Sequence, residues 1–154
     1  MKTIIAALDL QKKTSVVVDL AIEMAEKFNA ELHIVHVLAP VNTYIATSVA
    51  DPMAGIDASL LSNEMDAVEM QKNSAAEQLE KIQERIKTVQ VVTIILWGTV
   101  ANEVVQYARS INAGMIIAGA RPHTGLFRLL NKETSVKILH EAQIPILLIP
   151  IVTN

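Results

Sequence analysis

The residues best suited to bind an anion gather in one segment of the chain. Gly119 ends an apolar run, and Gly125 follows six residues later. Glycines at the exit of a strand let backbone amides approach a phosphate closely. Arg121 and Lys132 add fixed positive charge to the same segment, so a phosphate or another small anion is a suitable ligand. The alternative is a solvated loop in which the glycines turn the chain and the charges face water.

Asp9 is the best single polar candidate elsewhere in the chain. It follows the apolar run from Thr3 to Leu8. A carboxylate at the end of a strand accepts hydrogen bonds from ribose hydroxyls. The alternative role for Asp9 is to cap the helix that follows it.

A metal site and hydrolytic chemistry find little support. His33 and His36 lie three residues apart in an apolar run, where strand geometry points them to opposite faces of a sheet. They cannot chelate one ion together, so we expect core or hydrogen-bonded histidines. The chain has no cysteine and no Gly-x-Ser-x-Gly motif. We therefore predict no catalytic residue and no metal site.

Length and composition limit the fold that carries these groups. The 154 residues fit a single domain over residues 1–154, and a hydrophobic fraction of 51% excludes a disordered chain. Aromatic residues are only 3%, while Ala, Val, Ile and Leu abound. Such a composition is typical of a parallel sheet covered by helices with small side chains.

Charge and hydropathy exclude two classes of partner. The net charge of −3 gives no general attraction to nucleic acid or to an anionic membrane. No apolar run reaches the roughly 18 to 20 residues that span a bilayer, and Asp9 interrupts the N-terminal run before a signal-peptide core could form. We expect a soluble cytoplasmic protein.

Five short apolar runs predict buried strands, and helical periodicity fills the intervals between them. The strands are expected at 3–8, 32–38, 91–97, 115–119 and 146–149. The helices are expected at about 17–28, 65–86, 100–111 and 134–142. The residues predicted to bound helices are Thr14 or Ser15, Thr99 and Gly114. The apolar stripe predicted for the second helix is Met65, Val68, Ala75, Leu79, Ile82 and Ile86.

This alternation predicts an α/β fold with an open parallel sheet, helices on both faces and Rossmann-like topology. Ligands bind such sheets beyond the carboxyl ends of the strands, where the strand order reverses. We therefore expect a site among Asp9, the loop after Leu38, the turn at Trp97 and Gly98, and above all the segment from Gly119 to Glu133. The nearly uncharged stretch 39–63 is predicted to be irregular, as a lid or as a surface that packs on a partner.

Several segments together resemble the universal stress protein family, and the likeness spans essentially the whole chain. The most specific block runs from the strand ending at Gly119, through a basic loop and Gly-Leu-Phe-Arg-Leu-Leu from Gly125, to the proline-flanked strand 144–150. The resemblance implies a five-stranded parallel sheet of order 3-2-1-4-5 and a homodimer formed through the last strand. Such pairing would also cover an otherwise exposed apolar sheet edge.

One branch of that family binds ATP through a Gly-x-x-Gly-x9-Gly-Ser/Thr signature. Gly119 matches its first glycine, and Arg121 matches its basic residue. Pro122 stands at the second glycine, where it removes an amide donor. Ungapped counting places Lys132 at the third glycine and Glu133 at the hydroxyl position. A carboxylate there repels phosphate, so the phosphate end departs from the family pattern.

The nucleoside end of the signature is better matched. By the same resemblance, Asp9 and Val37 occupy the positions that contact ribose and adenine, although Ala7 replaces a common proline. The candidate nucleotide-binding residues are therefore Asp9, Val37, Gly119, Arg121, Gly125, Lys132, Thr134 and Ser135.

Two functions remain open. The favoured one is a non-enzymatic regulatory or stress-response dimer with a protein partner, weak or absent ATP binding and no firm cofactor. The alternative is a switch that binds ATP or AMP with slow or no hydrolysis, in which Arg121, Lys132 and Thr134 or Ser135 replace the glycine contacts. A synthetase or transferase is disfavoured because the sequence shows no catalytic set.

Overall fold

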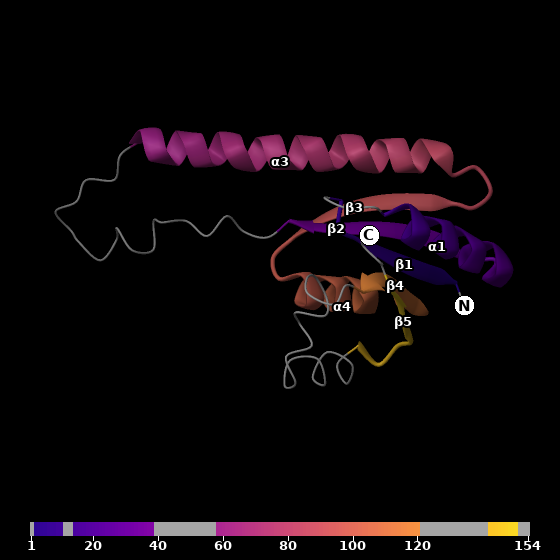
Figure 1. Cartoon of the computed structure of the whole chain (residues 1–154). Helices are drawn as coiled ribbons and strands as arrows, with labels where there is room; N and C mark the ends of the chain where they lie inside the picture. Colours follow the sequence, from indigo (N-terminus) through magenta and orange to yellow (C-terminus); the bar gives the residue numbers. More distant parts are fainter. Residues whose placement is uncertain (1, 11–13, 39–57, 121–141, 151–154) are drawn as a thin grey trace.

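The computed structural model describes residues 2–10, 14–38, 58–120 and 142–150. The elements in these parts of the chain are β1 (Thr3–Leu8), α1 (Ser15–Phe28), β2 (Glu31–Leu38), α3 (Ala58–Arg85), β3 (Val91–Trp97), α4 (Val100–Ser110), β4 (Met115–Ala120) and β5 (Ile146–Pro150) (Figure 1). The five strands form one parallel sheet in the order β3-β2-β1-β4-β5. The predicted sheet is confirmed, and its strand bounds differ from the predicted ones by at most one residue.

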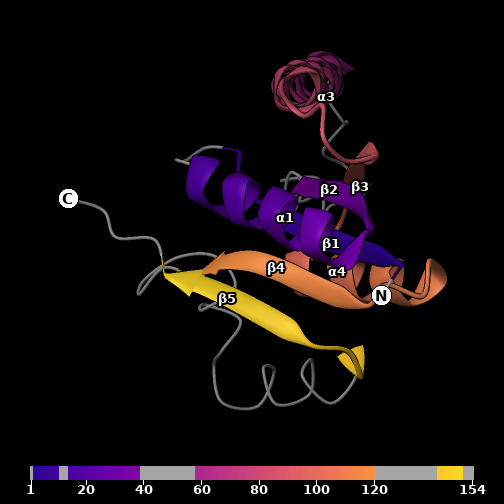
Figure 2. The same ribbon diagram turned by 90° about the vertical axis from the view of Figure 1, so that its right-hand side faces the viewer.

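Helices cover both faces of the sheet, as predicted: α1 and α3 lie on one face and α4 lies on the other (Figure 2). Successive residues of β1 face opposite sides. Ile4 and Ala6 pack with α1 and α3, whereas Ile5 and Ala7 pack with α4. The side chains of Ile4, Ile5 and Ala6 have no exposed area. The core therefore has two layers, one on each side of the central strand.

The ends of the helices depart from the predicted capping. Thr14 and Thr99 do occupy the N-cap positions of α1 and α4, but neither side chain forms a capping hydrogen bond. α4 ends at Ser110 rather than at Gly114, and Asn112 adopts a φ of 51° after it. Asparagine tolerates this left-handed conformation. The N–H of Gly114 instead donates to the Thr3 carbonyl at 2.8 Å and joins the incoming β4 to β1.

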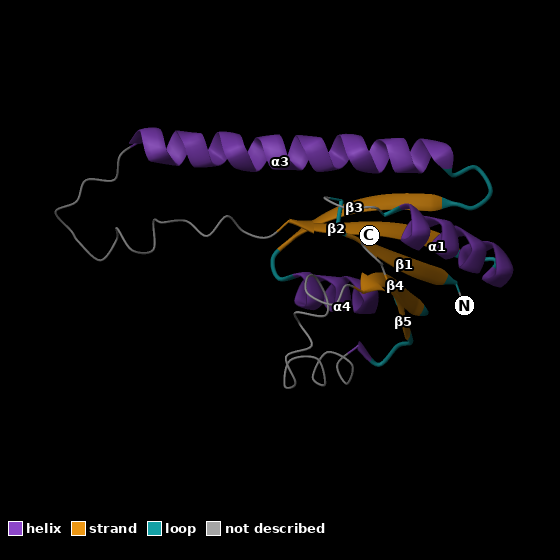
Figure 3. Cartoon of the chain, viewed as in Figure 1, coloured by secondary structure: helices purple, strands orange, loops and turns teal. Residues whose placement is uncertain are grey.

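The prediction for the second helix is wrong at its N-terminal end. α3 begins at Ala58, inside the stretch 39–63 that was predicted to be irregular. Met65 is 73% exposed rather than buried, and Val68 is only half-buried. Figures 1 and 3 show that this half of α3 extends past the ends of β2 and β3. The stripe residues that do pack on the sheet are Ala75, Leu79, Ile82 and Ile86.

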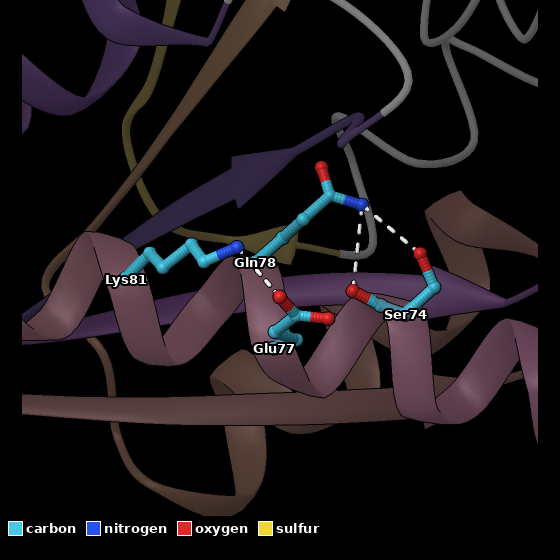
Figure 4. Close-up of polar contacts among 4 residues, drawn as sticks. All are labelled: Ser74, Glu77, Gln78 and Lys81. Atoms are coloured by element: carbon cyan, nitrogen blue, oxygen red, sulfur yellow. Dashed lines mark hydrogen bonds and ion pairs between the residues drawn. The ribbon is translucent and has the colours of Figure 1, made fainter.

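Local contacts span the exposed face of α3 (Figure 4). Lys81 Nζ donates to Glu77 Oε1 at 2.6 Å, and Gln78 Nε2 lies 3.4 Å from both the carbonyl and the hydroxyl oxygen of Ser74. The hydrogen bond and the opposite charge lower the pKa of Glu77 and raise the pKa of Lys81. Because both side chains are exposed, solvent screening leaves this pair a small role in stability.

A buried histidine links α4 to the sheet. His33 on β2 is 9% exposed, and its Nδ1 lies 2.8 Å from the Tyr107 hydroxyl oxygen. Its Nε2 is buried without a hydrogen bond, 3.4 Å from Glu31 Oε2. The ionised carboxylate of Glu31 attracts a ring N–H and repels a ring lone pair. A neutral His33 therefore carries its proton on Nε2 and accepts the Tyr107 hydroxyl at Nδ1.

We expect Tyr107→Phe to lower the free energy of unfolding by about 1–3 kcal/mol, because it leaves the buried Nδ1 of His33 without a partner. Burial first, and then the charge of Glu31, raises the pKa of Tyr107 above its ordinary value of 10.0. The folded chain thus holds the phenolic proton more tightly than the unfolded chain. This contribution to stability is complete below pH 10.0 and is lost as pH rises through the raised pKa.

Urea unfolding of the wild type and of Tyr107→Phe from about pH 7 to about pH 11 measures both effects. The stability difference between the two proteins should shrink on the alkaline side of this range. A difference that is absent at neutral pH, or that stays constant over the whole range, would contradict the assignment.

Candidate functional site

The strand order reverses between β1 and β4. β1 is followed along the chain by β2 on one side of it, whereas β3 is followed by β4 on the other side. In open parallel sheets this reversal leaves a crevice beyond the carboxyl ends of the strands, and ligands bind there. Asp9, directly after β1, and Gly119, near the end of β4, flank the reversal. Two of the candidate residues predicted from the sequence therefore lie beside the reversal, and their role in binding stays a prediction.

The strand register brings three of the candidate residues to one level of the sheet. Ala7 pairs with Val35 on β2 and with Ala118 on β4. Counting forward from these pairs puts Asp9 level with Val37 and one residue beyond Gly119. Neighbouring strands are about 4.8 Å apart, so β1 separates Val37 from Gly119 by about 10 Å. Residues from three distant segments thus line the same edge.

The three candidates differ in what they offer to a ligand. Asp9 is exposed, and its carboxylate can accept hydrogen bonds. The Val37 side chain is 8% exposed and belongs to the core that α4 covers, so its backbone is the part available at the edge. Gly119 is half-buried and pairs with Ile149 on β5. This arrangement suits a ligand with a polar group that Asp9 binds and a flat group that packs against the strand backbone.

The predicted phosphate contacts lie outside the described residues. Arg121, Gly125, Lys132, Thr134 and Ser135 all fall within 121–141, a segment that begins directly after β4. Whether they join the three residues at the edge stays a prediction. The expected helix at 134–142 lies in the same segment, apart from its last residue.

His36 lies at this edge, and sequence reasoning gave it no role there. It pairs with Leu8, the residue before Asp9, and its Nδ1 lies 2.8 Å from the Leu8 carbonyl oxygen. His33 and His36 therefore face opposite sides of β2, and both make hydrogen bonds, as predicted. The place of His36 opposite Leu8 becomes visible only once the strand register is known.

The turn after β3 reaches the same edge. The N–H of Gly98 donates to the Leu38 carbonyl at 3.0 Å and ties the end of β3 to the end of β2. Gly98 has a φ of 141°, and the Glu103 side chain from the first turn of α4 lies over it. A Cβ atom added to Gly98 would lie 2.6 Å from Glu103 Oε1. Only glycine fits this turn without rearrangement.

The described residues form neither a metal centre nor a membrane-spanning helix. These residues contain no group of three or more His, Asp or Glu placed to hold a metal ion. The described helices include none that is both long and apolar enough to cross a membrane. A shallow open groove runs along the exposed face of α3. It is lined by Asp66, Glu69, Met70, Asn73, Ser74 and Glu77.

Comparison with known proteins gives one consistent result. The sequence profile of the Universal stress protein family matches residues 1–150. The chain is 31% identical over 150 residues to universal stress protein A homolog 1 of Coxiella burnetii, with 95% of this chain and 94% of that protein covered.

Two similar solved structures hold nucleotides. A universal stress protein in complex with cAMP has 17% sequence identity and a TM-score of 0.56, with 97% of this chain and 96% of that chain covered. A universal stress protein from Archaeoglobus fulgidus in complex with dAMP has 15% identity and a TM-score of 0.53, with 96% and 97% covered. At these identities the two structures support the fold alone.

We expect Gly98→Ala to destabilise the protein by about 1–3 kcal/mol, because an alanine is strained at this positive φ and its Cβ meets Glu103. The variant Gly98→Ala/Glu103→Ala removes the contact but keeps the strain. Relative to Glu103→Ala alone, the double variant should lose less stability than Gly98→Ala loses relative to the wild type. The loss should still be greater than zero. Thermal and urea unfolding check this order, and a neutral Gly98→Ala would refute the account of the turn.

Proposed function

Because the chain belongs to the universal stress protein family, we propose that it is a non-enzymatic regulatory protein of the stress response. In this proposal it works in the cytoplasm as a homodimer with a regulatory protein partner, and it binds ATP weakly or not at all. The observation that carries the proposal is the contrast between the two ends of the signature. Asp9, Val37 and Gly119 meet at the carboxyl edge, whereas Pro122 and Glu133 replace the glycine and the hydroxyl that hold phosphates.

The substitutions at the phosphate end weaken ATP binding for separate reasons. Pro122 has no N–H to donate, and Glu133 places a negative charge where the phosphates of ATP would lie. Each charge-assisted hydrogen bond lost in this way is worth about 1.5–3 kcal/mol. Loss of two or more lowers the affinity for ATP by orders of magnitude in the usual pose.

A second candidate function is a switch that binds an adenine nucleotide with a single phosphate. The relatives solved with cAMP and dAMP support it, since both ligands carry one phosphate. Such a ligand needs fewer contacts at the end where the signature departs. In this proposal Asp9 and the Val37 backbone hold the nucleoside, Gly119 lets the phosphate approach, and Arg121 neutralises it.

The proposed dimer forms through β5. Among the described strands β5 pairs with β4 alone, which leaves its outer edge unpaired there. On this strand Leu148 is 38% exposed, which is high for a leucine beside the core. Its neighbour Ile149 is only 8% exposed. A second copy pairing along 146–151 would cover the edge and the exposed leucine.

The dimer can be tested by adding a charge to the outer strand. We expect the wild type to sediment as a dimer at micromolar concentration and Leu148→Lys to sediment as a folded monomer, because an unpaired charge resists burial in an apolar interface. Ile151→Lys, beyond the described residues, should act in the same way. The matched control is Val16→Lys, at a position on α1 that is 56% exposed. A monomeric wild type would eliminate the proposed dimer.

Calorimetry with ATP and magnesium tests the first function. We expect the wild type to bind ATP much more weakly than with a micromolar Kd, and Glu133→Ser to bind it more tightly because the repulsion is relieved. A low-micromolar Kd for ATP in the wild type would overturn the regulatory proposal in favour of an ATP switch.

Titration with AMP tests the second function. Arg121→Ala should weaken AMP binding by about 1.5–3 kcal/mol and reduce its dependence on salt, because a charged contact to the phosphate is lost. Lys87→Ala removes an exposed charge at the opposite end of β3 and is the matched control. Equal affinities for the wild type and Arg121→Ala would leave the segment after Gly119 as a solvated turn.

A further inference from the structure

One side chain at the carboxyl edge crosses from β2 to the end of β1. His36 Nδ1 lies 2.8 Å from the Leu8 carbonyl oxygen. Since a carbonyl only accepts hydrogen bonds, Nδ1 carries the hydrogen and donates it. The ring is half-buried, and the Leu8 side chain is 6% exposed. The contact is therefore partly shielded from competing water.

Peptide geometry carries the effect of this bond to the next residue. The Leu8 carbonyl and the Asp9 N–H belong to one planar peptide unit, which also includes the Cα atoms of both residues. A donor that fixes the direction of the carbonyl also fixes the plane and the position of the Asp9 Cα atom. Leu8 is the last residue of β1, so the strand ladder no longer orients the chain beyond this unit.

We propose that His36 is the positioning residue of the nucleoside site, holding the Leu8 carbonyl through Nδ1–H so that the Asp9 carboxylate meets a ribose. This inference rests on the nucleoside-binding role proposed above for the carboxyl edge. His36 itself lies on the α1 and α3 face of β2, opposite to the face of Val37, so it acts on the ligand through Asp9 and not by contact. The bond persists when the ring is protonated, because Nδ1 bears a hydrogen in both charge states.

A pair of amide substitutions separates this role from simple packing. The side-chain nitrogen of His36→Asn lies at the position of Nδ1 and can donate to Leu8, whereas that of His36→Gln lies at the position of Nε2 and cannot. With AMP as the probe, we expect His36→Asn to bind like the wild type and His36→Gln to bind about tenfold more weakly. If the side chain only fills space, the longer glutamine should be the better substitute.

Two measurements without nucleotide test the same contact. At a pH at which the His36 ring is neutral, ¹⁵N NMR of the wild type should show the ring hydrogen on Nδ1. Amide hydrogen exchange at Asp9 and Leu10 should be faster in His36→Gln than in the wild type and unchanged in His36→Asn. His33→Gln is the matched control on the other face of β2. It should lower the free energy of unfolding without changing exchange at Asp9 or the affinity for AMP.

The possible failures are distinguishable. A wild type that binds no AMP, cAMP or dAMP refutes the nucleoside site, and hydrogen exchange alone then decides whether His36 orders Asp9. Equal exchange and equal affinity in the two His36 variants would overturn the positioning role. So would an Nε2-protonated ring in the wild type.

Discussion

Burial of β1 on both faces is the constraint on which the rest of the structure depends. Ile4, Ile5 and Ala6 lose all exposure only if helices cover both sides of the sheet. Parallel pairing with β2 and β4 demands the same helices, because parallel strands are joined by crossovers rather than by tight turns. One consequence is that every strand ends at the same edge. Asp9, Val37 and Gly119 meet there although they are far apart in sequence.

The sequence predicted the strands well because buried parallel strands are short, continuous apolar runs. It also predicted which side of α3 packs on the sheet, since Ala75, Leu79 and Ile86 repeat at helical spacing. It failed at Met65 because periodicity tells which side of a helix is apolar and not how far the sheet extends beneath it. The strand order came from the family resemblance, as alternation of elements does not determine it.

The positions of two candidate residues at the carboxyl edge were predictable, but their surroundings were not. The rule for parallel sheets located Asp9 and Gly119 at the edge. The burial of the Val37 side chain and the bond from His36 to Leu8 depend on the register between strands. Register is a long-range property that no local pattern contains. Likewise, the clash that excludes a side chain at Gly98 comes from Glu103, which the helix geometry of α4 brings back over the turn.

The N-terminal half of α3 extends past the ends of β2 and β3 (Figure 1). Its local stability is therefore separate from the stability of the sheet. Among the residues of α3 whose burial is described, the ten from Met65 to Ser74 precede the first buried position, Ala75, and include only Val68 as a half-buried side chain. They extend about 15 Å, and their order depends on backbone hydrogen bonds and local pairs rather than on the core. These turns can fray with temperature while the sheet stays intact. Their composition is therefore free to vary without loss of the fold.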